Sequence, residues 1–388
     1  CNDYTKNALE EIGIPEEEFD KYFLKLENSK VENMDFSVED KLFVENFIKK
    51  TKGVKSERTR KILEIQREWT EQLKKCDEVE LYIIKSTVII AGTCTGFVSN
   101  RIIRDVEFDY VIVDEAAKAT FPELAVSLNK AHKIILVGDH QQLPPVLDTE
   151  IIRNNKEKLD EEGLEQGIFE RMYNMFPEDN KHRLTIQYRM HPTIGTLISH
   201  VFYNDEIQNG VEAQDRELCI EGYEGIAIEW ISTSKYSTKE RYEKEFDNNG
   251  KKSYQNYLER NIIERKLLEL DSKLVKRTKV AVITGYGSQK YILQTMVKQH
   301  SFKHIEVDVD TVDAFQGSQK DIILYSTVRS SGNKYGIGFL KSEARINVAF
   351  SRARCLLIIV GDMKFLDNYK IRGNKFPEII KYITESEG

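Results

Sequence analysis

Two short apolar runs that each end in acidic residues constrain the fold of this 388-residue chain more than any other feature. The first run, 111–113, leads into Asp114-Glu115, and the second, 134–137, leads into Gly138-Asp139. Apolar runs of this length on either side of a helix-like segment predict buried parallel strands joined by a crossover. Reactive groups collect beyond the carboxyl ends of such strands. The two acidic clusters therefore mark a candidate site for a metal-bound phosphate.

Further apolar runs alternate with helix-like segments along the chain. Strands are predicted at 86–93, 183–189, 225–231, 280–286, around 305–312, 321–328 and 355–362, and helices at 192–203, 254–271 and from about 343. This alternation predicts an α/β fold with mostly parallel sheets. Because the strands are too many for one compact sheet, we expect a first domain over 1–182 and a second over 183–388.

Four segments depart from this alternation. Residues 1–14 suggest the end of a strand followed by the start of a helix. Residues 15–80 are rich in Glu and Lys, and their apolar residues recur at helical spacing, which predicts an insertion of amphipathic helices. The charges of this insertion are more simply a solvated helix face than a binding surface. Residues 148–162 read as a charged loop, and the segment from about 205 to 253 is polar and rich in tyrosine.

The composition excludes few functions but favours one kind of compartment. The chain carries 57 basic and 64 acidic residues, a net charge of −7, so no overall basic field indicates nucleic acid. A basic groove can still exist on an acidic protein. The five cysteines are scattered without a CxxC pair, which favours a reducing cytoplasmic or nuclear compartment over a zinc site or a disulfide scaffold. No segment approaches the roughly 20 apolar residues of a membrane span.

The acidic clusters carry the residue types that nucleotide hydrolysis needs. Asp114 is a hard oxygen ligand for Mg²⁺, and Glu115 can accept a proton from an attacking water. Gln142 can hydrogen-bond both a γ-phosphate and that water, a role that glutamine has in GTPases. Each feature also has a simpler explanation. An acidic pair often ends a strand at the surface, and Pro144-Pro145 after Gln142 can form a rigid turn.

Three later segments, around 188–191, 316–317 and 345–352, also carry residues that can contact a nucleotide. Arg189 can clamp phosphate oxygens, whereas Tyr188 can stack on a base or fill the core, and His191 before a proline is more simply structural. Gly317 follows Gln316 and permits a close backbone approach to a ligand. A predicted helix carries Arg345, Asn347 and Arg352. An arginine presented to a phosphate from another domain is an arginine finger, and a basic helix end is the simpler alternative.

Five stretches, in this order, closely resemble motifs II to VI of superfamily 1 helicases, in the branch of the nonsense-mediated-decay helicase and senataxin. They are VIVDEAAKAT, LVGDHQQLPPV, QYRMHP, VDAFQGSQKD and INVAFSRAR, and the resemblance extends over roughly 86–388. It implies two RecA-like lobes, 1–182 and 183–388, with ATP and Mg²⁺ in the cleft between them. It also implies translocation 5′ to 3′ on single-stranded DNA or RNA.

The resemblance implies a role for each matching position. Asp114 would hold Mg²⁺, Glu115 would be the general base, and Gln142 would sense the γ-phosphate. Arg189 and Arg352 would contact the phosphates, with Arg352 as the finger. The remaining positions fall into two groups: Gly317, Tyr188 and Tyr286 near the nucleotide or its supporting shell, and Thr93, Thr284, Gln289 and Thr311 on the surface that binds the strand.

Two departures from the family pattern stand out. The phosphate loop GxxxxGK[ST] is absent, and Gly250-Lys251 cannot replace it, because it lacks the first glycine, the preceding strand and the right place in the motif order. We expect the loop to lie upstream of Cys1, so that the complete protein hydrolyses ATP and this chain alone does not. Gln319 stands where the family usually has glutamate, which can alter the coupling between ATP and the bound strand.

Two other functions remain open from the sequence. The first is a non-hydrolysing nucleic-acid-binding or scaffold module that keeps the helicase fold, which the absent phosphate loop favours. The intact acid, amide and arginine positions count against it, because an inactive motor has no chemical need for all of them. The second is a nucleotide-dependent switch without strand translocation.

Overall fold

The computed structural model describes residues 65, 77–103, 106–145, 167–248, 251–331 and 336–386. Compact packing divides the chain into two units, one of 1–92 with 100–105 and one of 93–99 with 106–388. In the first unit, helix α5 covers Asp77–Ser86. The predictions for 1–14, for nearly all of 15–80 and for 148–162 lie outside the described residues. The domain boundary near 182 stays a prediction.

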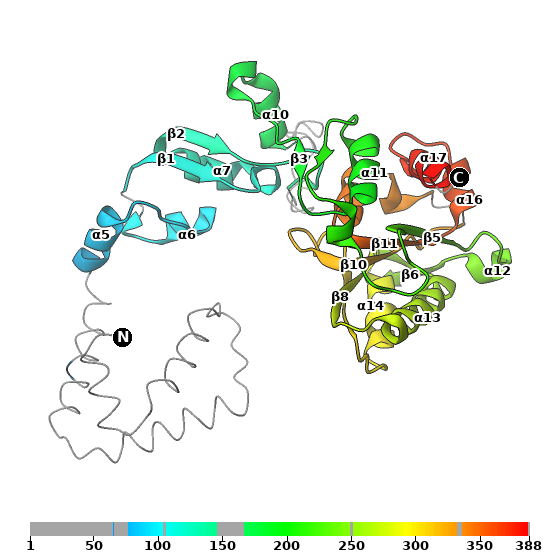
Figure 1. Ribbon diagram of the computed structural model, residues 1–388. Helices are drawn as coiled ribbons and strands as arrows, with labels where there is room; N and C mark the ends of the chain where they lie inside the picture. Colours follow the sequence, from blue (N-terminus) through cyan, green and yellow to red (C-terminus); the bar gives the residue numbers. More distant parts are fainter. Residues whose placement is uncertain are drawn as a thin grey trace, which may run out of the picture. The chain divides into compact units, whose positions relative to one another are not determined.

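The second unit holds the remaining elements (Figure 1). Its helices are α6 (Cys94–Ser99), α7 (Phe121–Leu128), α10 (Ile168–Met175), α11 (Pro192–Phe202), α12 (Thr238–Arg241), α13 (Tyr257–Lys273), α14 (Gly287–Val297), α15 (Glu343–Phe350), α16 (Met363–Asn368) and α17 (Phe376–Ser386), with short 3-10 turns η3 (Ala116–Lys118), η4 (Glu178–Asn180), η5 (Ala213–Arg216) and η6 (Gly338–Lys341). Its strands are β1 (Phe108–Val113), β2 (Ala131–Leu136), β3 (Ile186–Gln187), β4 (Gln208–Asn209), β5 (Ile228–Ser232), β6 (Lys244–Asn248), β7 (Lys251–Gln255), β8 (Thr278–Thr284), β9 (Ile305–Thr311), β10 (Lys320–Ser326) and β11 (Ala353–Gly361).

A five-stranded sheet in the order β5-β11-β10-β8-β9 forms the centre of this unit, and every neighbouring pair in it is parallel. All five strands were predicted from apolar runs, with bounds that differ by a few residues. The predicted helices at 192–203, 254–271 and from about 343 correspond to α11, α13 and α15. The predicted α/β class with parallel strands is confirmed.

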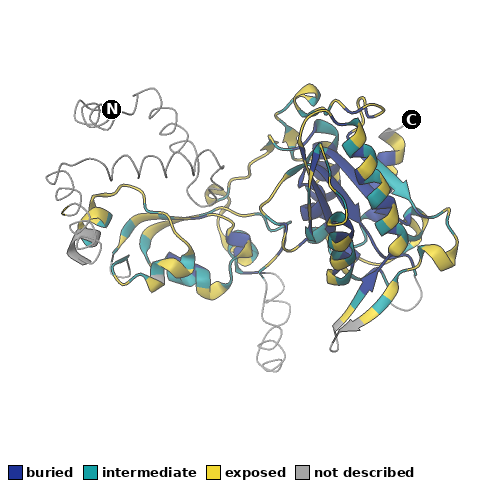
Figure 2. Ribbon diagram, turned by 90° about the horizontal axis from the view of Figure 1, so that it is seen from below, coloured by how far each residue is buried: buried dark blue, intermediate teal, exposed yellow. Residues whose placement is uncertain are grey.

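Strand alternation explains why this sheet is buried on both faces. Successive side chains of a strand point to opposite faces. On β10, Ile323 belongs to a hydrophobic cluster that includes residues of α11, α15 and α17. Its neighbours Ile322 and Leu324 belong to a second cluster with residues of α13 and α14. Helices thus cover both faces, and the sheet is the most deeply buried part of the unit (Figure 2).

Strands β1 and β2 pair in parallel through the crossover helix α7. A capping box begins α7, in which Glu123 accepts hydrogen bonds from the backbone N–H and the hydroxyl of Thr120, both at 2.8 Å. The predicted parallel pairing is confirmed, but the predicted burial is wrong. Tyr110 is 54% exposed and Ile112 is 66% exposed. The reason is that α7 covers one face of this pair, and no third strand pairs with it within the part of the chain that the structure describes.

The strand predicted at 86–93 is also wrong. Helix α5 continues through Ser86, residues 87–93 form neither helix nor strand, and Val88 is 97% exposed. A strand needs partners for its backbone groups, and none of the described strands pairs with this segment.

The antiparallel hairpin β6–β7 was not predicted. It lies in the polar, tyrosine-rich segment, where charged residues replace the apolar alternation that indicates a strand. Lys251 begins β7 rather than a helix, in agreement with the rejection of Gly250-Lys251 as a phosphate loop. None of the described helices is both long and apolar enough to cross a membrane.

Candidate functional site

The carboxyl end of β1 presents two exposed carboxylates, those of Asp114 and Glu115. Glu115 has a left-handed backbone, with φ of 54°. Its N–H donates to Asp114 Oδ1 at 2.9 Å, and the next N–H, that of Ala116, donates to the carbonyl of Val137 at 2.8 Å. A left-handed non-glycine residue is uncommon and is found preferentially at functional sites. The predicted acidic pair therefore lies at a strand end, held against the residue that follows β2.

Gly138 allows the turns after β1 and β2 to approach each other. A Cβ atom at this position would lie 2.8 Å from the backbone nitrogen of Ala117 and 3.2 Å from the ring of Phe169. Both contacts are closer than ordinary van der Waals packing. The absence of a side chain at Gly138 therefore brings the Asp114-Glu115 turn beside the loop 139–142.

Asp139 organises that loop. Its Oδ1 accepts from the N–H of Gln141 at 3.0 Å. Its Oδ2 accepts from Gln142 Nε2 at 2.8 Å and from the hydroxyl of Tyr203, at the end of α11, at 2.5 Å. One carboxylate thus fixes the Gln142 side chain and joins the loop to a helix 64 residues further along the chain.

Arg352 meets the same glutamine from the other side. Its Nη2 donates to Gln142 Oε1 at 2.9 Å, and its Nε donates to the carbonyl of Val348 at 3.0 Å. Burial and, after it, the neighbouring Arg189 cation lower the pKa of Arg352 to about 10, while Glu115 acts in the opposite direction. Arg352 is therefore a buried cation at neutral pH, within electrostatic reach of both Arg189 and Glu115. The structure brings Gln142 and Arg352 together and places Glu115 and Arg189 near them.

Tyr203 and Asn347 complete this contact, and neither was predicted to act in it. Asn347, on α15, donates from Nδ2 to the carbonyl of Gln141 at 3.0 Å and to the hydroxyl of Tyr203 at 2.8 Å. In the sequence, Asn347 was only a neighbour of Arg352 on a predicted helix, and Tyr203 was only a helix end. No local pattern could have paired them, because the contact depends on how distant segments pack.

Arg216 holds the segment that carries Tyr188 and Arg189. Its Nη2 donates to the carbonyl of Tyr188 at 2.7 Å, and its Nε donates to that of Arg189 at 2.9 Å. Gln187 supports the same turn, since its Oε1 accepts from the N–H groups of Arg189 and Met190. The Arg189 side chain reaches α15 and donates to the carbonyl of Ser351 at 3.4 Å, whereas Tyr188 is 63% exposed. Sequence reasoning did not single out Arg216.

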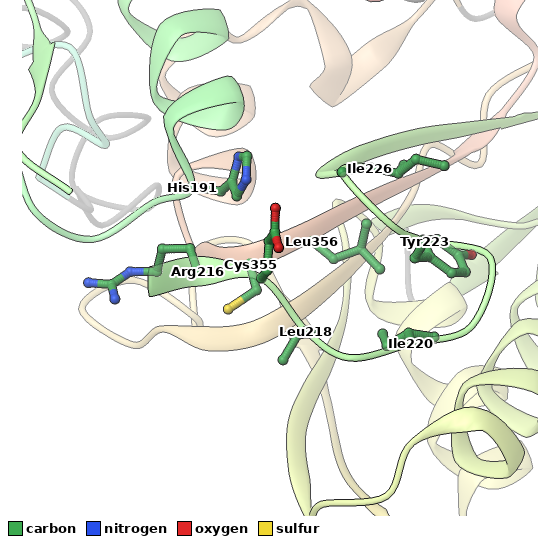
Figure 3. A pocket seen from close by; sticks show the side chains of 10 residues that line it. His191, Arg216, Leu218, Ile220, Tyr223, Ile226, Cys355 and Leu356 are labelled. Atoms are coloured by element: carbon green, nitrogen blue, oxygen red, sulfur yellow. The ribbon is translucent and has the colours of Figure 1, made fainter. Parts of the chain in front are cut away.

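His191 is buried and structural. Its Nδ1 accepts from the N–H of Thr193 and so caps the start of α11. Burial is the main reason why its pKa is lowered. It borders a crevice with Cys355 and Leu356, from which the Arg216 guanidinium is turned away (Figure 3). The crevice encloses about 10 Å³, room for one water molecule at most.

The other predicted positions lie on the surface or in the interior. Gly317 is exposed and has φ of 81°, which accounts for a glycine there, and Thr311 ends β9 half-buried. Tyr286 is 3% exposed, and its ring contacts those of Tyr254 and Phe339 edge-on. Thr284 is fully buried. Gln289 is fully buried too, and it hydrogen-bonds the backbone of Asn256 and the hydroxyl of Ser326. Neither Thr284 nor Gln289 presents a surface to a ligand in this structure.

Thr93 is exposed and precedes α6. Its hydroxyl accepts from the N–H of Gly96 at 3.1 Å, and its carbonyl accepts from the N–H of Phe97 at 3.1 Å. This arrangement caps the helix. Contacts of Thr93 and of the other predicted strand-binding residues with nucleic acid stay predictions.

The described carboxylates fit a shared rather than an enclosed magnesium site. Nowhere in the described ranges do three or more His, Cys, Asp or Glu side chains gather as metal ligands. Magnesium that acts with nucleotides is commonly bound by one or two carboxylates together with phosphate oxygens. The exposed Asp114 at the end of β1 is suited to supply such a carboxylate.

Comparison with known proteins identifies the family. Two sequence models, both described as "AAA domain", match residues 8–150 and 164–364. A Regulator of nonsense transcripts 1 homolog from Neurospora crassa is 35% identical over 301 residues, which are 76% of this chain and 26% of that protein. The ATP-dependent helicase NAM7 of Saccharomyces cerevisiae is 34% identical over 299 residues, 76% of this chain and 29% of that protein.

An archaeal relative extends the match. The uncharacterized ATP-dependent helicase MJ0104 of Methanocaldococcus jannaschii is 29% identical over 351 residues, 86% of this chain and 46% of that protein. The chain thus spans less than half the length of each of these three relatives. The AAA-domain matches, the relatives and the ordered motifs agree with one another. The chain belongs to the AAA-domain family, as a superfamily 1 helicase of the nonsense-mediated-decay type.

Proposed function

We propose that the complete protein is an ATP-dependent helicase or translocase that moves 5′ to 3′ on single-stranded DNA or RNA in the cytoplasm or nucleus. The observation that carries the proposal is the hydrogen bond between Gln142 and Arg352. It joins the loop after β2 to Arg352, the second residue beyond the end of α15. The motifs of these two segments have nucleotide-sensing and phosphate-contacting roles in the family. In this proposal 1–182 and 183–388 are RecA-like lobes with ATP between them.

The residues around this contact divide the work of hydrolysis. Asp114 would hold Mg²⁺, which when bound would neutralise negative charge on the phosphate groups. Glu115 accepts a proton from the attacking water. Arg189 and Arg352 supply positive charge to the transferred phosphoryl group, where preorganised charge is most effective. Gly317, Tyr188 and Tyr286 belong to the nucleotide site or its supporting shell.

Gln142 is suited to sense the γ-phosphate because both ends of its amide are already held. Its Nε2 donates to Asp139 and its Oε1 accepts from Arg352. A phosphate that attracts the Arg352 guanidinium competes directly with Gln142 Oε1 for it. The released oxygen can then orient the attacking water. In this proposal, binding of the nucleotide exchanges an internal hydrogen bond for contacts with the phosphate.

The nucleic-acid part of the proposal rests on the family motifs. Thr93, Thr284, Gln289 and Thr311 stand at the matching strand-binding positions, although Thr284 and Gln289 are buried in this structure. A strand contact through these two requires a rearrangement of the end of β8, which carries Thr284, and of the start of α14, which carries Gln289. Backbone tracking and base stacking serve DNA and RNA alike, so both are candidate strands.

An ATPase assay of the protein at its native length tests the proposal. We expect hydrolysis in the presence of Mg²⁺ that single-stranded DNA or RNA stimulates, together with 5′ to 3′ movement on a partial duplex. Nucleic-acid binding without hydrolysis would instead identify a scaffold module. Hydrolysis that no polynucleotide stimulates, without movement, would identify a nucleotide-dependent switch.

A further inference from the structure

Building on the proposed function, we propose that Tyr203 and Asn347 are positioning residues for ATP hydrolysis. Their shared hydrogen bond fixes the loop 139–142 against the helix that leads to Arg352, and so sets where the Gln142 amide and the Arg352 guanidinium meet. Neither residue needs to touch the nucleotide for this role. Both act through Asp139 and Gln141.

The Tyr203 hydroxyl lies at the centre of the contact. It donates to Asp139 Oδ2 at 2.5 Å and accepts from Asn347 Nδ2 at 2.8 Å. The same Oδ2 accepts from Gln142 Nε2 at 2.8 Å. Two donors therefore share one carboxylate oxygen, so loss of the hydroxyl changes the environment of the oxygen that orients the Gln142 side chain. Burial and the adjacent Asp139 raise the pKa of Tyr203, which keeps its hydroxyl protonated as a donor.

Asn347 supplies the link to the helix. It is fully buried on α15 and lies five positions before Arg352 in the sequence. Its single NH₂ group donates both to the Tyr203 hydroxyl and to the carbonyl of Gln141. Its Oδ1 has no hydrogen-bond partner within the described part of the chain. The Asn347 side chain thus makes its two donated hydrogen bonds, to the loop and to Tyr203, while its own oxygen accepts none in the described part of the chain.

The hydrogen bond between Tyr203 and Asn347 differs from ordinary packing because of the two segments that it joins. One end is the residue pair Asp139 and Gln141, which brackets His140 and precedes Gln142 directly. The other end is helix α15, and Arg352, two residues beyond the end of that helix, donates to Gln142. A hydrogen bond that only stabilised the fold would not need to converge on the loop of the glutamine. Misplacement of catalytic groups by about 1 Å can reduce a rate by about 10²-fold.

The test removes the Tyr203 hydroxyl and compares the resulting variant with a matched control variant. Tyr203→Phe keeps the ring and removes the donor. Tyr223→Phe makes the same change elsewhere: that hydroxyl also lies between a carboxylate, Glu229 at 2.5 Å, and a nitrogen donor, Lys266 at 2.9 Å, but no hydrogen bond joins it to the loop 139–142. Both variants should unfold at similar temperatures, because they lose similar hydrogen bonds.

Only Tyr203→Phe should impair the reaction. We expect kcat to fall about tenfold, the loss typical of one hydrogen bond to a charged group, with less than about a threefold change in KM for ATP. Tyr223→Phe should leave both parameters within about twofold of the wild type, the range expected of a substitution away from the site. Equal kcat values for the two variants would overturn the proposal.

A double-mutant cycle with Asn347→Ala gives an independent answer. If the two residues act through one contact, Tyr203→Phe combined with Asn347→Ala should lower kcat no further than the more severe single change. Multiplication of the two effects would overturn the proposal. Absence of nucleic-acid-stimulated ATPase in the wild type would instead overturn the proposed function, and this inference with it.

Discussion

At the scale of single residues, the Gln142 amide is where the candidate site is assembled. An amide offers one acceptor and one donor group, and here the acceptor meets the Arg352 cation while the donor meets the Asp139 carboxylate. A carboxylate at this position could not donate to Asp139, and an aliphatic side chain could meet neither partner. Because a glutamine amide can both donate and accept, one side chain connects the Asp139 carboxylate with the Arg352 guanidinium.

Glu115→Gln tests the general base. The substitution removes the proton acceptor and leaves the size of the side chain and the turn that carries it unchanged. We expect turnover in the complete protein to fall by at least about 10²-fold while ATP binding is retained. Steady-state ATPase and equilibrium nucleotide binding measure the two effects. Glu170→Gln, on α10, is the control and should behave as the wild type. A fall in turnover of less than about tenfold would rule out this role, since general bases contribute about 10²–10⁴.

Arg352→Ala tests the proposed role of Arg352 as an arginine finger. The substitution removes the guanidinium from Gln142 and from the proposed phosphate site. We therefore expect kcat to fall by roughly 10³-fold, the lower end of what arginine fingers contribute. Arg354→Ala is the matched control, because Arg354 lies two residues further on and pairs instead with Asp321 at 3.1 Å. Single-turnover hydrolysis separates the chemical step from product release. An unchanged kcat in Arg352→Ala would refute the arginine-finger role.

At the scale of elements, the site depends on how closely the turns after β1 and β2 approach each other. The backbone contact of Ala116 with Val137 and the lack of a side chain at Gly138 set this spacing. Glu115 takes its left-handed backbone in the same region. Glu115 and Gln142, the proposed general base and the proposed γ-phosphate sensor, are thus placed by one tight contact between two turns rather than by separate elements.

Gly138→Ala should disturb that spacing. The added Cβ would lie 2.8 Å from a backbone nitrogen, an atom that cannot rotate away, so one turn has to move. We expect a stability loss of about 1–3 kcal/mol, typical of overpacking, and a lower kcat. Thermal unfolding and ATPase assays measure them. At Gly287 a Cβ would meet nothing within 4 Å, so Gly287→Ala should be neutral or slightly stabilising. Equal behaviour of the two variants would show that the spacing is not tight.

At the scale of the whole molecule, a buried acid connects strand β10 of the main sheet with helices α13 and α14. Glu259, on α13, is completely buried. It accepts from the hydroxyl of Ser326 at 2.6 Å and from the N–H of Val328 at 2.9 Å, and Gln289 of α14 donates to the same Ser326 hydroxyl at 3.1 Å. Burial raises the pKa of Glu259 to about 8, against the lowering effect of these donors. The acid is therefore mostly protonated in the folded protein at neutral pH.

This buried acid predicts a pH dependence of stability. Between its ordinary pKa near 4.5 and about 8, the folded state keeps a proton that the unfolded state releases. The contribution of Glu259 to stability is therefore fully present below about pH 4.5 and is lost as the pH rises to about 8, by at most about 1.4 kcal/mol per pH unit. Urea unfolding from pH 5 to 8 should show this decline. Glu259→Gln should remove it and Glu170→Gln should keep it. The same slope in Glu259→Gln would disprove the assignment.

Most of the main sheet could be predicted from the sequence, because its signal is local. Apolar runs such as 280–286 and 321–328 predicted central strands that are buried on both faces. The hairpin β6–β7 was missed because its strands are polar, and the strand at 86–93 was wrong because an apolar run alone does not supply a pairing partner. The exposure of Ile112 was missed for the same reason: burial depends on neighbours that a local pattern does not contain.

The sequence by itself determined the α/β class, the parallel order of β1 and β2, and the identity of the acids, amide and arginines that the motifs carry. These depend on residue type and spacing, which are properties of the chain as written. Only the tertiary structure decided that Gln142 meets Arg352, that Tyr203 and Asn347 join the two segments, and that Thr284 and Gln289 are buried. Such contacts connect residues as many as 210 positions apart, and packing of distant segments brings them together.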